Sequence, residues 1–246
     1  MDKKFFHEFI ERGLVTNNRD NTPKARHEEM PLPEKPYNPQ APIIKLTDPD
    51  ILENPDVGFL ELVECRSSIR SYTNEPFTIN ELSYLLWCTQ GVKQMLSERV
   101  TQRNVPSAGS RHAFETYLFI DKVEGLKPGL YRFLAIGHVL QPVDTSDDVK
   151  ERMHSCFNKV KMFEDAAITF IWAANMPRME YTFGGRALQY LYIDAGHVCQ
   201  NLYLAAYTIK AGVCAVGHFH DYEINEALGL DGENDFVVYA AHVGKV

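Results

Sequence analysis

Apolar residues after position 57 recur at three- and four-residue spacings, which predicts several helices. Residues 58–65, 147–157 and 221–228 each fit a short helix. A longer helix follows Thr78, because Thr78 and Glu81 have the spacing of a capping box. The apolar side chains of that helix share one face: Ile79, Leu82, Leu85, Leu86 and Val92.

The longest helix is predicted over residues 187–210, with Gly212 as its C-cap glycine. Its apolar positions form a continuous stripe: Leu191, Ala195, Val198, Leu202, Ala205 and Ile209. One subunit is not expected to bury all the apolar surface of a stripe of this length. We therefore expect the helix to lie at the centre of a homodimer.

Runs of β-branched and aromatic residues predict five strands: 115–121, 129–133, 138–143, 167–174 and 236–243. The second and third of these form a hairpin, and the fourth has apolar residues on both faces. Helices and strands do not alternate as regular βαβ units. The fold class is therefore predicted as α+β, with an antiparallel sheet of four or five strands flanked by helices.

Eight of the thirteen prolines fall between Pro23 and Pro55. Proline lacks a backbone donor and fixes φ, so this stretch is neither a helix nor a central strand. We expect an extended arm over residues 1–57, running across the surface of the domain or of its partner, followed by one domain over 58–246. The first dozen residues fit either a short amphipathic helix or a disordered tail.

The net charge of −8 disfavours nucleic acid and anionic membranes as partners. The longest apolar runs, such as 166–174, are too short to cross a bilayer. Acidic residues near the start disfavour a secretory signal, and the five cysteines form no CxxC motif. We therefore expect a cytoplasmic protein with reduced, mostly buried thiols.

Several polar residues suggest a site only weakly. The spacing of Cys214, His218 and His220 fits no usual zinc pattern, so no metal is expected. His197 reads as an ordinary helix histidine. Arg178 and Tyr181 fit either the mouth of an active site or the surface.

The first candidate site contains two arginines and two hydroxyls within five residues: Arg66, Ser67, Ser68 and Arg70. Dense donors and positive charge suit a phosphate, and a cation would also stabilise a reduced flavin ring. The alternative is a solvated basic turn.

Two further segments combine small residues with few charges. Residues 105–112 contain Pro106, Ser107, Ala108 and Ser110, and would let backbone approach a flat ligand. Residues 212–219 contain Val216, Gly217 and His218, whose backbone N–H groups would suit a flavin edge. The alternatives are an ordinary loop and a buried turn that links two helices.

Together and in this order, the three segments resemble the FMN-dependent nitroreductase superfamily, and most closely its SagB-type dehydrogenase branch. The resemblance covers about residues 60–246 and includes further short motifs: Glu81 to Trp87, Gly129-Leu130-Tyr131, Asp194-Ala195-Gly196-His197, Gln200-Asn201-Leu202, Leu228-Gly229-Leu230 and Val243-Gly244.

This resemblance implies a nitroreductase-like FMN-binding domain in an intertwined homodimer. Arg66, Ser67 and Ser68 would bind the FMN phosphate and ribityl chain, and Arg70 would face the pyrimidine. The segment with Pro106, Ser107, Ala108 and Ser110 would reach the flavin of the other subunit. The turn of Val216, Gly217 and His218 would follow the N5 edge.

The sequence departs from the family pattern twice. Where azoline dehydrogenases carry a Lys-Tyr pair, this chain has Thr182-Phe183 before Gly184-Gly185-Arg186, which argues against azoline oxidation. A basic tail that many relatives direct at the phosphate is reduced here to Lys245.

The resemblance implies ping-pong hydride transfer from NAD(P)H through FMN to a small aromatic acceptor, a nitro compound or a quinone. No side chain need act as acid or base, so no catalytic residue is assigned. The alternatives are a non-catalytic flavin-binding module and a flavin-fragmenting or azoline-oxidising relative.

Overall fold

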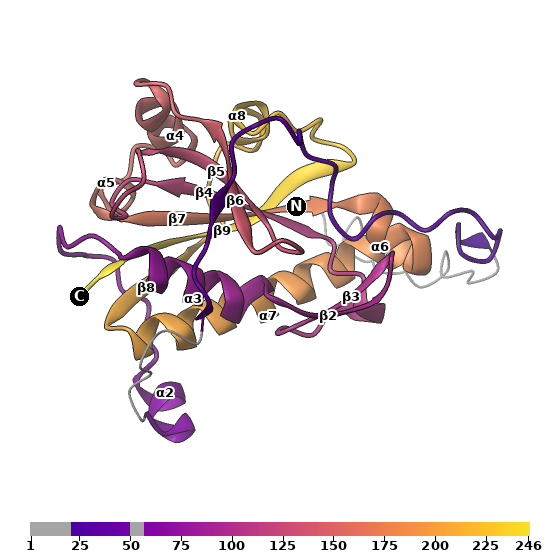
Figure 1. The fold of residues 1–246 in the computed structure, drawn as a ribbon, viewed down its shortest axis with the longest axis horizontal. Coiled ribbons are helices and arrows are strands. Elements are labelled where there is room, and N and C mark those ends of the chain that lie inside the picture. Colours follow the sequence, from indigo (N-terminus) through magenta and orange to yellow (C-terminus); the bar gives the residue numbers. More distant parts are fainter. Residues whose placement is uncertain (1–20, 50–56) are drawn as a thin grey trace, which may run out of the picture.

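The computed structural model describes residues 21–49 and 57–246, and a seven-stranded antiparallel sheet forms its middle layer (Figure 1). The predicted α+β class is confirmed, but the sheet has more strands than the four or five expected. The strands follow one another across the sheet as β1 (Ile44–Lys45), β6 (Val139–Asp144), β5 (Gly129–Leu134), β4 (Phe114–Ile120), β7 (Ile168–Asn175), β9 (Asp235–Lys245) and β8 (Ala211–Val216).

Helices cover both faces of this sheet (Figure 1). The two long helices, α3 (Ile79–Gln90) and α7 (Ala187–Thr208), pack together on one face. The other face carries α4 (Val149–Cys156), α5 (Lys161–Asp165) and α8 (Asp221–Ala227). Two more helices lie outside these layers: α2 (Phe59–Cys65) and α6 (Met176–Phe183). The helices predicted at 58–65, 147–157, 187–210 and 221–228 are confirmed.

Strand β7 carries apolar residues on both faces, as predicted. Phe170 and Trp172 belong to the core under α3 and α7, whereas Ile171 and Ala173 belong to the core under α4 and α8. All four side chains are nearly inaccessible to solvent. This double burial explains why the strand reads as a continuous apolar run.

The capping box of α3 is confirmed. The Glu81 backbone N–H donates to the Thr78 hydroxyl over 3.3 Å, and the Thr78 N–H donates to the Glu81 carboxylate over 2.9 Å. The helix ends at Gln90, so the prediction that Val92 continues its apolar face is wrong. Val92 instead begins β2 (Val92–Ser97), which pairs with β3 (Val100–Arg103) in a hairpin that the sequence pattern did not predict.

The end of α7 also differs from the prediction. Ile209 is the C-cap, and Lys210 takes the left-handed turn with φ of 55°. Gly212 is therefore not the cap but part of the edge strand β8, and residues 211–216 are not a turn between two helices. A Cβ at Gly212 would lie 2.6 Å from Ile69, so glycine is needed there for close packing of residues 66–72.

The arm, drawn in indigo in Figure 1, crosses the sheet in a largely irregular conformation. Buried guanidiniums bind its carbonyl oxygens: Arg178 donates to Leu32 over 2.7 Å and Arg132 donates to Lys35 over 2.7 Å. Arg178 and Tyr181 are both buried, so the surface alternative is wrong for these two residues. The division at residue 57 stays a prediction, and the helix expected over the first dozen residues lies outside the described residues.

Both arginines bind one buried carboxylate, Glu115, to which the Lys35 backbone N–H also donates over 2.8 Å. Burial alone would raise the pKa of Glu115, but Arg178 and Arg132 outweigh it and lower the pKa to about 2. The charged network therefore fixes the arm to β4, β5 and α6.

The five cysteines carry no disulfide. Three of them are buried, as expected: Cys156, Cys199 and Cys214. No helix within residues 21–49 and 57–246 is both long enough and apolar enough to span a membrane. The cellular compartment stays a prediction.

Candidate functional site

The first and third candidate segments meet at the edge of the sheet. Ser68 pairs with Val213 in an isolated parallel bridge, and the Ile69 N–H donates to the Val213 carbonyl over 2.9 Å. The Tyr72 hydroxyl fixes the same segment by donating to the carbonyls of Ile69 and His242, over 2.8 and 3.0 Å. Residues 66–70 are therefore a fixed extended strip beside β8 rather than a free turn.

Tyr203 on α7 joins these two segments. Its hydroxyl lies 3.0 Å from the Ser68 hydroxyl and accepts the Ala215 backbone N–H over 2.9 Å. The Arg66 guanidinium lies over its ring, 5.4 Å from the centroid. Tyr203 was not predicted as a site residue. The only feature of the sequence that could have indicated it is a tyrosine within a helix rich in leucine and alanine.

The strip is electropositive. Arg66 is half-buried and Arg70 is exposed, and within the described part of the chain neither forms an ion pair with a carboxylate. The Arg70 guanidinium donates to the Ser68 carbonyl over 3.3 Å. Burial raises the pKa of the nearby Cys214 thiol, and Arg70 opposes that rise. Two cations and the Ser67 and Ser68 hydroxyls make a donor set that fits an anionic group such as a phosphate.

The residues that follow β8, next to this strip, are exposed to solvent. Val216 is buried, whereas Gly217 and His218 are exposed. A Cβ at Gly217 would meet nothing closer than Tyr239 at 3.9 Å, so packing within the chain does not require the glycine. The backbone here remains accessible to a flat ligand.

The second segment is held elsewhere, by Asp194 on α7. The carboxylate of Asp194 accepts the Ser107 hydroxyl over 2.6 Å and the Ala108 N–H over 3.1 Å. Burial raises the pKa of Asp194, and these two hydrogen bonds oppose the rise. The loop continues through Gly109 and Ser110, both in left-handed conformations with φ of 57° and 52°. In the sequence, Asp194 is recognisable only as part of the motif Asp194-Ala195-Gly196-His197. Its hydrogen bonds with Ser107 and Ala108 are evident only in the tertiary structure.

Within one chain the second segment is remote from the other two. Its anchor, Asp194, and the joining residue, Tyr203, are nine positions apart on α7, or about 14 Å along the helix axis. The structure thus brings together residues 66–70 and 212–218 but not residues 106–110. Such a separation is compatible with the expectation that this loop serves the other subunit's site.

Lys245 makes its contacts with Glu81, Ile209 and Phe77 rather than with the electropositive strip. Its ammonium pairs with Glu81 at the start of α3, donates to the Ile209 carbonyl over 3.2 Å and lies 4.9 Å from the centre of the Phe77 ring. The side chain is buried. In this conformation its charge is neutralised within the chain.

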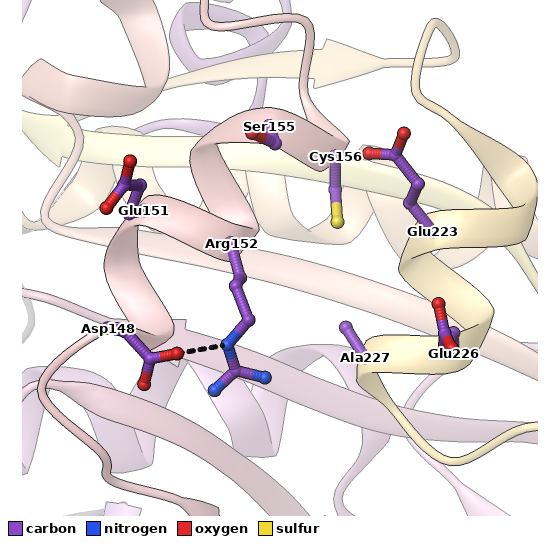
Figure 2. A pocket seen from close by; sticks show the side chains of 8 residues that line it. All are labelled: Asp148, Glu151, Arg152, Ser155, Cys156, Glu223, Glu226 and Ala227. Atoms are coloured by element: carbon purple, nitrogen blue, oxygen red, sulfur yellow. Dashed lines mark hydrogen bonds and ion pairs between the residues drawn. The ribbon is translucent and has the colours of Figure 1, made fainter.

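Other candidate groups do not form a site. A cleft of about 610 Å³ between α4 and α8 holds none of the predicted residues (Figure 2). Its lining includes Glu151, Glu223 and Glu226, together with an ion pair between Asp148 and Arg152, so it would repel a phosphate. No cluster of metal-ligating side chains occurs among residues 21–49 and 57–246, and His197 is exposed on α7.

A second cavity adjoins the loop of residues 106–110. Its lining residues come from the arm, that loop, α6 and α7: Thr22, Lys24, Ala25, Gly109, Thr182, Phe183 and Tyr190. Thr182 and Phe183, which the family resemblance aligns with the Lys-Tyr pair of azoline dehydrogenases, therefore face a cavity. Neither side chain can act as a base near neutral pH.

Comparison with known proteins identifies relatives of this chain. The sequence profile of the Nitroreductase family matches residues 63–245. A protein of Methanocaldococcus jannaschii, provisionally named a nitroreductase, is 31% identical over 182 residues, or 73% of this chain and 89% of the relative.

Solved structures share the fold. A nitroreductase-like protein of Anabaena variabilis superposes with a TM-score of 0.68 at 26% identity over 84% of this chain, which spans only 42% of that protein. One from Ralstonia eutropha gives 0.68 at 21% identity, covering 89% of this chain and 96% of the other. A chain of the Escherichia coli microcin synthetase McbBCD complex gives 0.62 at 16% identity, covering 100% and 98%. The expected nitroreductase-like fold is confirmed.

Proposed function

Because the chain belongs to the nitroreductase family, we propose that it is an FMN-dependent oxidoreductase that works as a homodimer. The observation that carries this proposal is that the Ser68–Val213 bridge joins residues 66–70 to β8. Arg66 and Arg70 of this strip form no ion pair with a carboxylate in the described part of the chain. When bound, FMN would accept a hydride from NAD(P)H and pass two electrons to an acceptor, so that quinone, NAD(P)H and a proton yield hydroquinone and NAD(P)⁺.

Each group of the strip takes one task in this proposal. Arg66, Ser67 and Ser68 hold the phosphate and ribityl chain, and Arg70 provides positive charge near the pyrimidine. Residues 216–218 offer backbone N–H groups along the other ring edge. Tyr203 is a positioning residue, because it holds both the Ser68 hydroxyl and the Ala215 N–H. We leave Lys245 out of the site, since Glu81 already neutralises it.

The apolar stripe of α7 is buried in the core of the single chain, so the expectation that it needs a partner to cover it is wrong. The homodimer is proposed instead from apolar side chains that the single chain leaves exposed. Helix α2 has no buried residue and exposes 73% of Phe59 and 69% of Leu60. On α7, Tyr192 and Ile193 expose 58% and 54% of their side chains. Large exposed apolar side chains on neighbouring helices are typical of an interface. In the dimer, Pro106, Ser107, Ala108 and Ser110 would approach the flavin of the partner.

The direction of the reaction is proposed from the cavity beside α6. Thr182 and Phe183 offer no base to remove a proton from a substrate, which favours reduction of an acceptor over azoline oxidation. The likeness to a chain of McbBCD over the whole length supports placement near the SagB-type branch, with different chemistry.

Two measurements test the proposal. The purified protein is expected to be yellow and to bind about one FMN per subunit in a fluorescence-quench titration. In a stopped-flow instrument, mixing with NADH or NADPH should bleach the flavin absorbance rapidly. Failure to bind FMN would contradict the cofactor assignment. Binding without bleaching by either nucleotide would instead indicate a flavin-binding module.

A further inference from the structure

The cavity between the arm and the start of α7 has the size of a small-molecule pocket. Its volume is about 550 Å³, which lies within the usual range for ligand sites. The Lys24 backbone N–H donates to the Tyr181 carbonyl over 3.0 Å, and the Ala25 N–H donates to the Thr22 hydroxyl over 3.2 Å. The arm therefore forms a fixed wall of the pocket.

The opposite wall is aromatic. The rings of Phe183 and Tyr190 lie 4.4 Å apart at an interplanar angle of 43°. Gly109 packs against the Phe183 ring, and a Cβ at Gly109 would come within 3.1 Å of that ring. Together these surfaces suit a flat aromatic ligand.

The charge around the pocket is positive. Among residues 21–49 and 57–246, Lys24 is the only charged side chain that lines it, and no carboxylate of these residues does. The Arg186 guanidinium lies 5.9 Å from the centre of the Tyr190 ring, which adds a second cation beside the aromatic wall. An anionic substituent on the ligand would therefore be favoured at the Lys24 side.

We propose that this pocket binds the electron acceptor and that Lys24, Phe183 and Tyr190 select planar aromatic molecules that carry an anionic group. The proposal rests on the proposed function, because Gly109 belongs to the loop assigned to the partner's flavin. A nitroaromatic bound there takes two electrons and two protons, supplied by one NAD(P)H and one solvent proton. It becomes the nitroso compound, and one nitro oxygen leaves as water.

The test compares 4-nitrobenzoate with 4-nitrobenzamide, which has the same shape and no charge. Dissociation constants are measured by calorimetry on the oxidised, flavin-loaded protein, and reoxidation rates are measured after photoreduction. The wild type should bind the benzoate about threefold more tightly, the size of a partly exposed ion pair. Lys24→Gln should abolish this preference, whereas Lys161→Gln, an exposed lysine on α5 across the sheet, should keep it.

A second variant tests the location without removing charge. Ala25 is exposed, and Ala25→Trp should place an indole in the pocket and weaken both probes about tenfold through steric exclusion, at unchanged flavin content. Wild-type affinities and reoxidation rates in both Lys24→Gln and Ala25→Trp would overturn the pocket assignment and leave the proposed function intact. A protein that takes up no FMN would overturn the proposed function and the acceptor role with it.

Discussion

The hydroxyl of Tyr203 lies 3.0 Å from the hydroxyl of Ser68 and thereby connects α7 to the strip of residues 66–70. Tyr203→Phe removes this contact and leaves the Ala215 N–H without its acceptor. One such hydrogen bond contributes about 1 kcal/mol, so the FMN dissociation constant should rise about fivefold. A fluorescence-quench titration measures the change, with Tyr222→Phe, at an exposed tyrosine on α8, as the control. Unchanged affinity in Tyr203→Phe would mean that the hydroxyl does not position the site.

The two arginines of the strip should differ in their effect on redox potential. Arg70→Ala removes a cation proposed to stabilise the reduced ring, so the midpoint potential should fall by roughly 20–40 mV, equivalent to about 1–2 kcal/mol for two electrons. Arg66→Ala should weaken FMN binding and barely move the potential, because the phosphate is the same in both redox states. Potentiometric titration of both variants gives the comparison. Equal potentials and wild-type affinities would show that the strip does not bind flavin.

Loss of the buried carboxylate at Glu115 should destabilise the chain strongly. Glu115→Gln leaves the buried guanidiniums of Arg132 and Arg178 without a counter-charge, at a cost of about 3–5 kcal/mol in the free energy of unfolding. Urea denaturation should show this, and limited proteolysis should cleave the arm faster. Glu124→Gln, at an exposed turn, is the control and should unfold like the wild type.

His242 should make the folded state sensitive to mild acid. Burial lowers its pKa to about 4, so the folded chain binds fewer protons than the unfolded chain, whose histidine has a pKa near 6.5. The stability due to neutral His242 is therefore full above pH 6.5 and is lost as the pH falls towards 4, by roughly 3 kcal/mol. His242→Gln should flatten this part of the stability profile measured by urea titration at several pH values. A slope equal to that of the wild type would contradict the assignment.

Charge on the exposed face of α2 should weaken the proposed dimer. Leu60→Glu places a carboxylate where 69% of an apolar side chain is exposed, and burial of that charge in an interface is costly. Light scattering at micromolar concentration should show a dimer for the wild type and dissociation for the variant. Ile136→Glu, at the β5–β6 turn, changes a similar exposed residue and should stay dimeric. A monomeric wild type would refute the dimer itself.

Local patterns in the sequence determined most of the helices and the central strands. The capping box at Thr78 and Glu81 fixed the start of α3, since both groups act within one turn. Strand β7 was readable because burial on both faces leaves an uninterrupted apolar run. The basic strip was recognisable in the sequence because residues 66–70 contain two arginines and two serines, which are all hydrogen-bond donors.

Partners distant in the chain were decided only by the tertiary structure. Gly212 looks like a helix cap locally, yet the approach of Ile69 and the pairing with β9 make it part of a strand. The role of Tyr203 depends on Ser68, 135 positions away, and that of Glu115 depends on the arm 80 positions earlier. Such contacts form when the sheet brings remote segments together, and no local periodicity encodes them.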